Sequence, residues 1–179
     1  MEKTRKNIER IFRVSGKSDE LFDAFQLALS MHLSDADLYK ILLANPALST
    51  DELLMYTEKI ANEFKKCCFD LFLWTGEILG NRIGDSSSTN DALNYFKRAV
   101  TEKPTEIQPY LSILGLYNYE IDLPINSEII KEVVSGIKKA KQTSKLYYAL
   151  ADHYEKAENY HLKKKYLGLA EKAALQENQ

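Results

Sequence analysis

Residues 144–173 constrain the fold most, because they read as two helices joined by a short polar turn. In the first half, apolar residues recur at three- and four-residue steps and so share one helix face: Leu146, Tyr147, Leu150, Ala151 and Tyr154. After the turn at 156–159, the second half follows a similar pattern: Tyr166, Leu167, Leu169, Ala170 and Ala173. A linker this short predicts an antiparallel helical hairpin.

One hairpin cannot bury both of its apolar faces, so the sequence predicts neighbouring hairpins of the same kind. A similar series lies upstream: Tyr110, Ile113, Leu114 and Tyr117, followed by Val133 and Gly136. A third series lies before it: Phe72, Thr75, Gly76 and Leu79, followed by Ala92, Phe96, Ala99 and Pro104. We therefore expect about three degenerate repeats within 67–175, at 69–104, 107–141 and 144–173.

These series resemble the tetratricopeptide repeat (TPR) family. The resemblance rests on an order of aromatic, leucine, small and aromatic residues: Tyr147, Leu150, Ala151 and Tyr154, then Tyr160, Leu167 and Ala170. Lys163 departs from the family, which usually has a small residue there. The resemblance implies an all-α fold, a right-handed α–α superhelix of stacked antiparallel hairpins, with about eight to nine helices in this chain.

The pattern in residues 1–66 is helical but lacks the repeat, so we expect this segment to form degenerate repeats, a cap or a separate small bundle. We expect helices at 4–14 and 18–31, and a third that starts in a capping box at Ser34 and Asp37 and runs through 43. A second capping box, Ser49 with Glu52, starts a helical stretch without a clear breaker as far as 83. The stretch is one long helix or two helices with a kink near 67–69, and its length favours the kink.

The boundaries of the later helices follow from polar residues and prolines. A polar loop is expected at 85–90, where Thr89 or Asn90 caps a helix through 101. The next helix is expected at 105–120, with Pro109 in its first turn. Asn126 or Ser127 is expected to cap a helix through 141. Residues 176–179 form a tail that should fray.

The net charge and the hydropathy limit the classes of partner and the cellular compartment that we expect for this chain. A net charge of −2 gives no general attraction to nucleic acid. The most apolar window, 67–79, contains Asp70 and Glu77 and is shorter than the ~20 residues that span a bilayer, so no membrane span is expected.

Cys67 and Cys68 are adjacent and point about 100° apart on a helix, so they favour neither a disulfide nor a shared metal site. A cytoplasmic protein with reduced thiols is the simplest prediction.

The sequence lacks the phosphate-binding loop, the His-Glu-x-x-His and Cys-x-x-Cys motifs and the nucleophile elbow. We therefore expect no enzyme activity, no catalytic residues and no cofactor. A less favoured hypothesis is a helical enzyme or metal protein that uses His153 and His161, which flank the last predicted turn close to Glu155 and Glu158.

The TPR resemblance implies a scaffold that binds a peptide or helix of a partner protein in a concave groove. The groove is lined by the first helix of each hairpin, which in this chain gives Glu77, Asn81, Gln108, Leu111, Asn118, Tyr119, Lys145, Tyr148, Asp152, Glu155 and Lys156. The clamp with which some members hold a C-terminal carboxylate is not reproduced, because Tyr148 and Asp152 occupy two of its places. The alternative is a structural homo-oligomer that associates through the N-terminal helices or the last helix.

Overall fold

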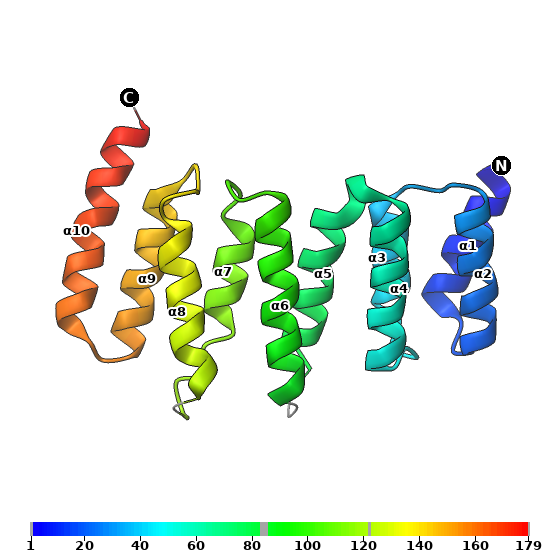
Figure 1. The fold of residues 1–179 in the computed structure, drawn as a ribbon, viewed down its shortest axis with the longest axis horizontal. Helices are drawn as coiled ribbons and strands as arrows, with labels where there is room; N and C mark the ends of the chain where they lie inside the picture. The colour runs from blue at the N-terminus through cyan, green and yellow to red at the C-terminus, as the bar shows by residue number, and fades with distance from the viewer. Residues whose placement is uncertain (1, 83–85, 122, 179) are drawn as a thin grey trace. The chain divides into compact units, whose positions relative to one another are not determined.

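The computed structural model describes residues 2–82, 86–121 and 123–178, and these form helices joined by turns and loops, without strands (Figure 1). They form ten α-helices and one short 3-10 helix, slightly more than expected. The chain divides into two compact units, Met1–Ile78 and Leu79–Gln179. Each unit is described separately below.

The first unit contains helices α1 to α4, the 3-10 helix η1 and most of α5. Their bounds are Glu2–Val14, Ser18–Ser30, Ala36–Leu43, Thr50–Glu63, Lys65–Cys67 and Cys68–Gly80. Helix α1 packs against α2 and α3, and α3 packs against α4. Aromatic rings form the centre of the core: Phe25 lies 4.7 Å from Tyr56 and 6.3 Å from Tyr39, centroid to centroid. All three side chains are almost fully buried.

Local hydrogen bonds determine where α3 and α4 begin. The capping box at Ser49 is confirmed, because Ser49 Oγ accepts from Glu52 N and Glu52 Oε2 accepts from Ser49 N. The cap of α3 is Asp35 rather than Ser34, since Asp35 is the residue with extended backbone before the helix and its Oδ1 accepts from Asp37 N at 3.0 Å. Arg5 of α1 pairs with the same carboxylate and so ties α1 to the start of α3.

The stretch after Ser49 is two helices rather than one. The break comes slightly earlier than predicted, at Phe64, whose φ of −124° and ψ of 79° are incompatible with a continuing α-helix. The turn η1 follows, and α5 then ends at Gly80 rather than at 83, which lies outside the described residues. Cys67 and Cys68 are both buried at this junction, and neither forms a disulfide within the described residues.

The second unit contains five helices after the end of α5. Helices α6 to α10 span Ser86–Glu102, Gln108–Gly115, Pro124–Gly136, Thr143–Lys156 and Tyr160–Glu177. Helix α7 packs against α6, α8 and α9, and α9 lies along α10 (Figure 1). Gly136 lets α8 pass close to α7, because a Cβ atom at this position would overlap the ring of Tyr110.

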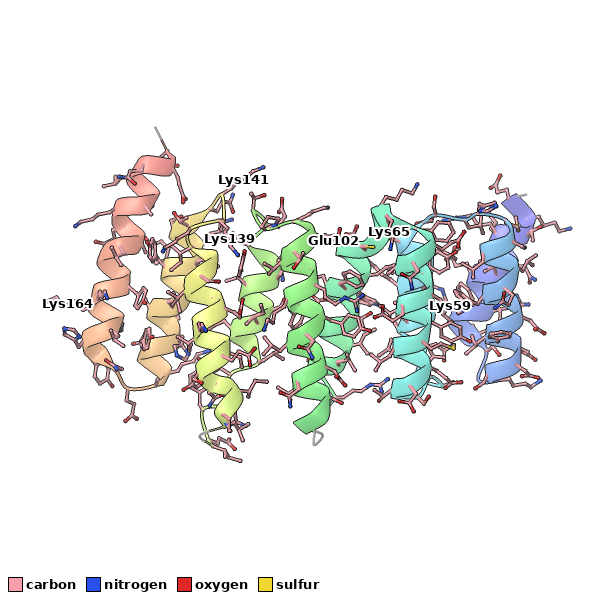
Figure 2. All side chains as sticks on the ribbon, in the orientation of Figure 1. Lys59, Lys65, Glu102, Lys139, Lys141 and Lys164 are labelled. Atoms are coloured by element: carbon pink, nitrogen blue, oxygen red, sulfur yellow. The ribbon has the colours of Figure 1, made fainter. Side chains whose placement is uncertain are left out.

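Several predicted boundaries in this unit are wrong. The predicted loop at 85–90 is helical from Ser86 onward, and residue 85 lies outside the described residues, so neither Thr89 nor Asn90 is a cap. Helix α7 is shorter at both ends than 105–120. Helix α8 begins at Pro124, which puts Asn126 and Ser127 inside it, and it ends at Gly136. In the turn that follows, Lys139 and Lys141 are both exposed, and Figure 2 shows Lys141 pointing away from the helices.

The predicted hairpin at the end of the chain is present as α9 and α10. Glu158 adopts a left-handed φ of 55° in the turn, and Asn159 caps α10 by accepting from Leu162 N at 3.1 Å. At the other end, Glu177 of α10 accepts hydrogen bonds from Ser144 N and Thr143 Oγ1, each at 3.0 Å. The pair is therefore antiparallel, and the predicted tail is helical as far as Glu177.

No helix in the described part of the chain combines the length and the apolar character needed to cross a membrane.

Candidate functional site

The segment 116–121, between α7 and α8, is held by side-chain amides rather than by helical bonds. Asn126 is buried; its Oδ1 accepts from Asn118 N at 3.1 Å and its Nδ2 donates to Asn118 O at 2.9 Å. Asn118 Oδ1 in turn accepts from the backbone N–H groups of Glu120 and Ile121, both at 2.9 Å. These bonds end α7 early and fix the loop that carries Tyr117 and Tyr119. Sequence reasoning assigned Asn126 to a helix cap and missed this role.

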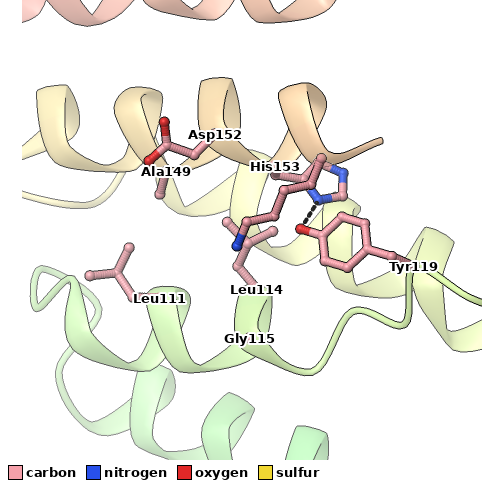
Figure 3. A pocket seen from close by; sticks show the side chains of 8 residues that line it. Leu111, Leu114, Gly115, Tyr119, Ala149, Asp152 and His153 are labelled. Carbon is pink, nitrogen blue, oxygen red and sulfur yellow. Dashed lines mark hydrogen bonds between the residues drawn. The ribbon is translucent and has the colours of Figure 1, made fainter. Parts of the chain in front are cut away.

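His153 of α9 fixes the side chain of Tyr119. The imidazole is only 3% exposed, and its Nδ1 lies 3.0 Å from the Tyr119 hydroxyl (Figure 3). The rings of Tyr117 and Tyr154 approach it edge-on, with centroids at 4.5 and 4.9 Å. Burial, followed by the nearby charge of Lys156, lowers the pKa of His153 below 6.5. A neutral imidazole can accept a hydrogen bond from the Tyr119 hydroxyl at Nδ1, and so holds the ring in place.

Beside this contact lies a pocket of about 280 Å³, which we call the α7–α9 pocket (Figure 3). It is lined by Leu111, Leu114, Gly115, Tyr119, Ala149, Asp152, His153 and Lys156. The leucines and Ala149 supply an apolar floor, and Asp152 and Lys156 supply charge at the rim. Lys156 Nζ lies 5.9 Å from the centre of the Tyr119 ring. The Tyr119 side chain remains 44% exposed despite its bond to His153.

The structure brings four of the eleven predicted groove residues together in this pocket: Leu111, Tyr119, Asp152 and Lys156. They come from α7, from the loop after it and from α9. The segments are separated in sequence by about one repeat, so only the packing of α7 against α9 makes them neighbours.

The other predicted groove residues of the second unit lie elsewhere. Glu155 pairs with Lys163 of α10 at 2.5 Å, on the side of α9 that faces its hairpin partner. Lys145 lines a separate depression at the opposite end of α9, together with Glu177. Gln108 and Tyr148 are exposed but outside the α7–α9 pocket, and Asn118 holds the loop.

Glu77 and Asn81 lie on either side of the division between the two units. Glu77 is half-buried in the first unit, and burial raises the pKa of its carboxyl. Asn81 is exposed at the start of the second unit. Neither residue lines the α7–α9 pocket.

The first unit has a pocket of about 320 Å³ in an equivalent place, between α1 and α3. It is lined by Phe12, Arg13, Asp37, Lys40, Ile41, Ala44, Asn45, Pro46 and Trp74. Trp74 of α5 donates its indole N–H to the carbonyl of Lys40 at 3.0 Å. Sequence reasoning assigned no binding residue to α1 or α3, because that stretch lacks the repeat pattern.

The arrangement of histidines gives no support to a metal site. His153 is buried with Nδ1 bonded to Tyr119, whereas His161 is exposed on α10. Within the described ranges, no three His, Cys, Asp or Glu side chains are grouped so as to hold a metal ion.

Comparisons of the chain with protein-family models, with curated proteins and with solved structures found no match. The TPR resemblance of the sequence therefore stays a prediction.

Proposed function

We propose that this chain is a TPR-like superhelix of stacked hairpins that binds a peptide or helix of a partner protein on the face formed by the first helices. Support for the architecture comes from each unit separately. In the first unit α1 contacts α3, and in the second α7 contacts α9. In both, the first helices of consecutive hairpins are neighbours, as stacking requires.

The observation that carries the proposal is the α7–α9 pocket, where four predicted groove residues converge. Its volume of about 280 Å³ is just below the roughly 300–1,000 Å³ of pockets that enclose small-molecule ligands. A pocket of this size suits one or two side chains of a larger partner. An exposed tyrosine held in one orientation is also typical of protein-binding surfaces, since it adds contact area at a small entropic cost.

The lining predicts which peptides bind. Leu111, Leu114 and Ala149 form an apolar floor that accepts an aliphatic or aromatic anchor residue. No ion pair joins Asp152 or Lys156 to another described residue, so both can bond to the partner. A carboxylate accepts from peptide N–H groups and an ammonium donates to carbonyl oxygens. We therefore expect peptides with one large apolar anchor between polar residues.

A peptide selection tests the proposal. Random peptides displayed on phage are selected on the wild-type chain, and the Kd of each synthetic peptide is measured by calorimetry for the wild type and for Leu111→Asp. A charge on the pocket floor is expected to weaken binding about tenfold or more. The matched control is Val134→Asp, on the exposed side of α8 and outside the pocket, which should leave Kd unchanged. Equal affinity of wild type and Leu111→Asp would show that the peptides bind elsewhere.

A further inference from the structure

Helix α10 exposes a stripe of side chains on the side opposite its contact with α9. Its buried residues, Ala170 and Ala173, lie on the other face of the helix. The stripe, called the α10 stripe below, consists of Tyr160, Lys164, Leu167, Gly168, Glu171 and Leu175. These positions fall within about 100° of the helix circumference. Figure 2 shows Lys164 pointing away from α9.

The α10 stripe is apolar to an unusual degree for a surface. Tyr160 is 66% exposed, Leu175 is 69% exposed and Leu167 is 37% exposed. A Cβ atom at Gly168 would have no neighbour within 4 Å. Lys164 and Glu171 form no ion pair with any described residue, whereas Lys163, on the α9-facing side of the same helix, pairs with Glu155. An apolar stripe that also carries two unpaired opposite charges suits a partner with both features.

The order of residues along the stripe is self-complementary. When a second α10 is laid antiparallel across the first, with a twofold axis between residues 167 and 168, each position meets its counterpart. Lys164 then faces Glu171 of the second copy, and Tyr160 faces Leu175. Leu167 faces Gly168, where the missing side chain leaves room for it. Each of these contacts occurs twice, as an isologous interface requires.

We propose that two copies of this chain associate through the α10 stripe, with the two α10 helices antiparallel. The same residues disfavour the parallel, in-register arrangement, because it would place Lys164 beside Lys164 and Glu171 beside Glu171. Helix α10 has 18 residues, so it is about 27 Å long. A single pair of such helices buries less than the roughly 1,200 Å² typical of stable complexes, and the dimer is therefore weak and concentration-dependent.

A charge swap tests both the face and the direction of pairing. Sedimentation equilibrium is measured at low salt over a range of concentrations up to about 1 mM, where a weak complex forms. Lys164→Glu alone and Glu171→Lys alone each create two like-charge contacts, and each is expected to raise the dimer Kd about tenfold or more. The matched control, Lys172→Glu, reverses a charge on α10 outside the stripe and should leave the Kd within about twofold.

The same variants restore pairing when they are combined. An equimolar mixture of Lys164→Glu and Glu171→Lys chains should form a heterodimer, because both contacts then join opposite charges. The chain that carries both substitutions should dimerise as the wild type does. Circular dichroism establishes that each variant is folded.

Three results would overturn the proposal. A wild-type chain that stays monomeric throughout the concentration range has no such interface. A dimer that neither single reversal weakens uses another face. Single reversals that weaken the dimer without rescue in the mixture are incompatible with the antiparallel register.

Discussion

His153 holds Tyr119 in the wall of the α7–α9 pocket, and its protonation should be visible in the stability of the protein. Its pKa is lowered in the folded chain by burial and by Lys156, so the unfolded chain binds the proton more readily. Stability is then complete above about pH 6.5 and falls as the pH is lowered through that value.

Urea unfolding at pH 7.5 and pH 5.5 measures this effect. The wild type should lose stability between the two pH values, and His153→Phe, which keeps a ring beside Tyr117 and Tyr154, should lose less. Hydrogen bonds lower the pKa of four carboxyl groups, those of Glu20, Asp35, Glu52 and Glu177. These groups therefore titrate at a lower pH and do not contribute to the change in stability between pH 7.5 and pH 5.5. An equal loss in both proteins would show that His153 is not the titrating group.

Tyr39 and Tyr110 provide a matched pair of buried tyrosines. Both side chains are 0% exposed, but the Tyr110 hydroxyl donates to the carbonyl of Pro104 at 3.0 Å, whereas the Tyr39 hydroxyl has no hydrogen-bond partner among the described residues. Tyr39→Phe should therefore leave the free energy of unfolding unchanged or raise it, and Tyr110→Phe should lower it by about 1 kcal/mol. Urea unfolding of the two variants checks this, and a larger loss in Tyr39→Phe would contradict it.

Glu177 shows how one helix stabilises the end of another. Its carboxylate accepts three hydrogen bonds at the start of α9, from Ser144 N, Ser144 Oγ and Thr143 Oγ1, and these lower its pKa. The interaction is the tertiary equivalent of an N-cap, so Glu177→Ala should lower the melting temperature and cost about 1 kcal/mol. The neighbouring exposed residue gives the control, Gln176→Ala, with no expected effect.

The contribution of Glu177 to stability is fully present above pH 4.5 and is lost as the pH falls below that value.

The sequence predicted which segments form helices, but it did not predict where several of those helices begin or end. Ser49 and Glu52 are three residues apart, so the start of α4 depends only on local chemistry and was predicted correctly. The end of α7 depends instead on Asn126, which reaches back to Asn118 from the next helix. The same holds for the last turn of α10, whose Glu177 is stabilised by α9. Long-range hydrogen bonds leave no periodic pattern, which explains these errors.

At the scale of the molecule, the apolar periodicity was sufficient to predict an all-helical chain. Several positions that carry the repeat pattern are buried in the second unit, including Tyr110, Ile113, Leu150 and Ala170, whereas Tyr160 and Leu167 are exposed. The site was predictable only in part. Leu111, Tyr119, Asp152 and Lys156 followed from the resemblance, whereas the burial of His153 depends on a loop that Asn118 and Asn126 shape.

We expect the face joining α7 and α9 to bind a partner peptide. Methyl NMR on the leucine- and alanine-labelled chain tests it most directly, with a peptide selected on the wild type added in steps. We expect the methyl signals of Leu111, Leu114 and Ala149 to shift most, and those of Leu167 and Leu175 to stay in place. The largest shifts at methyl groups outside the α7–α9 pocket would contradict the account.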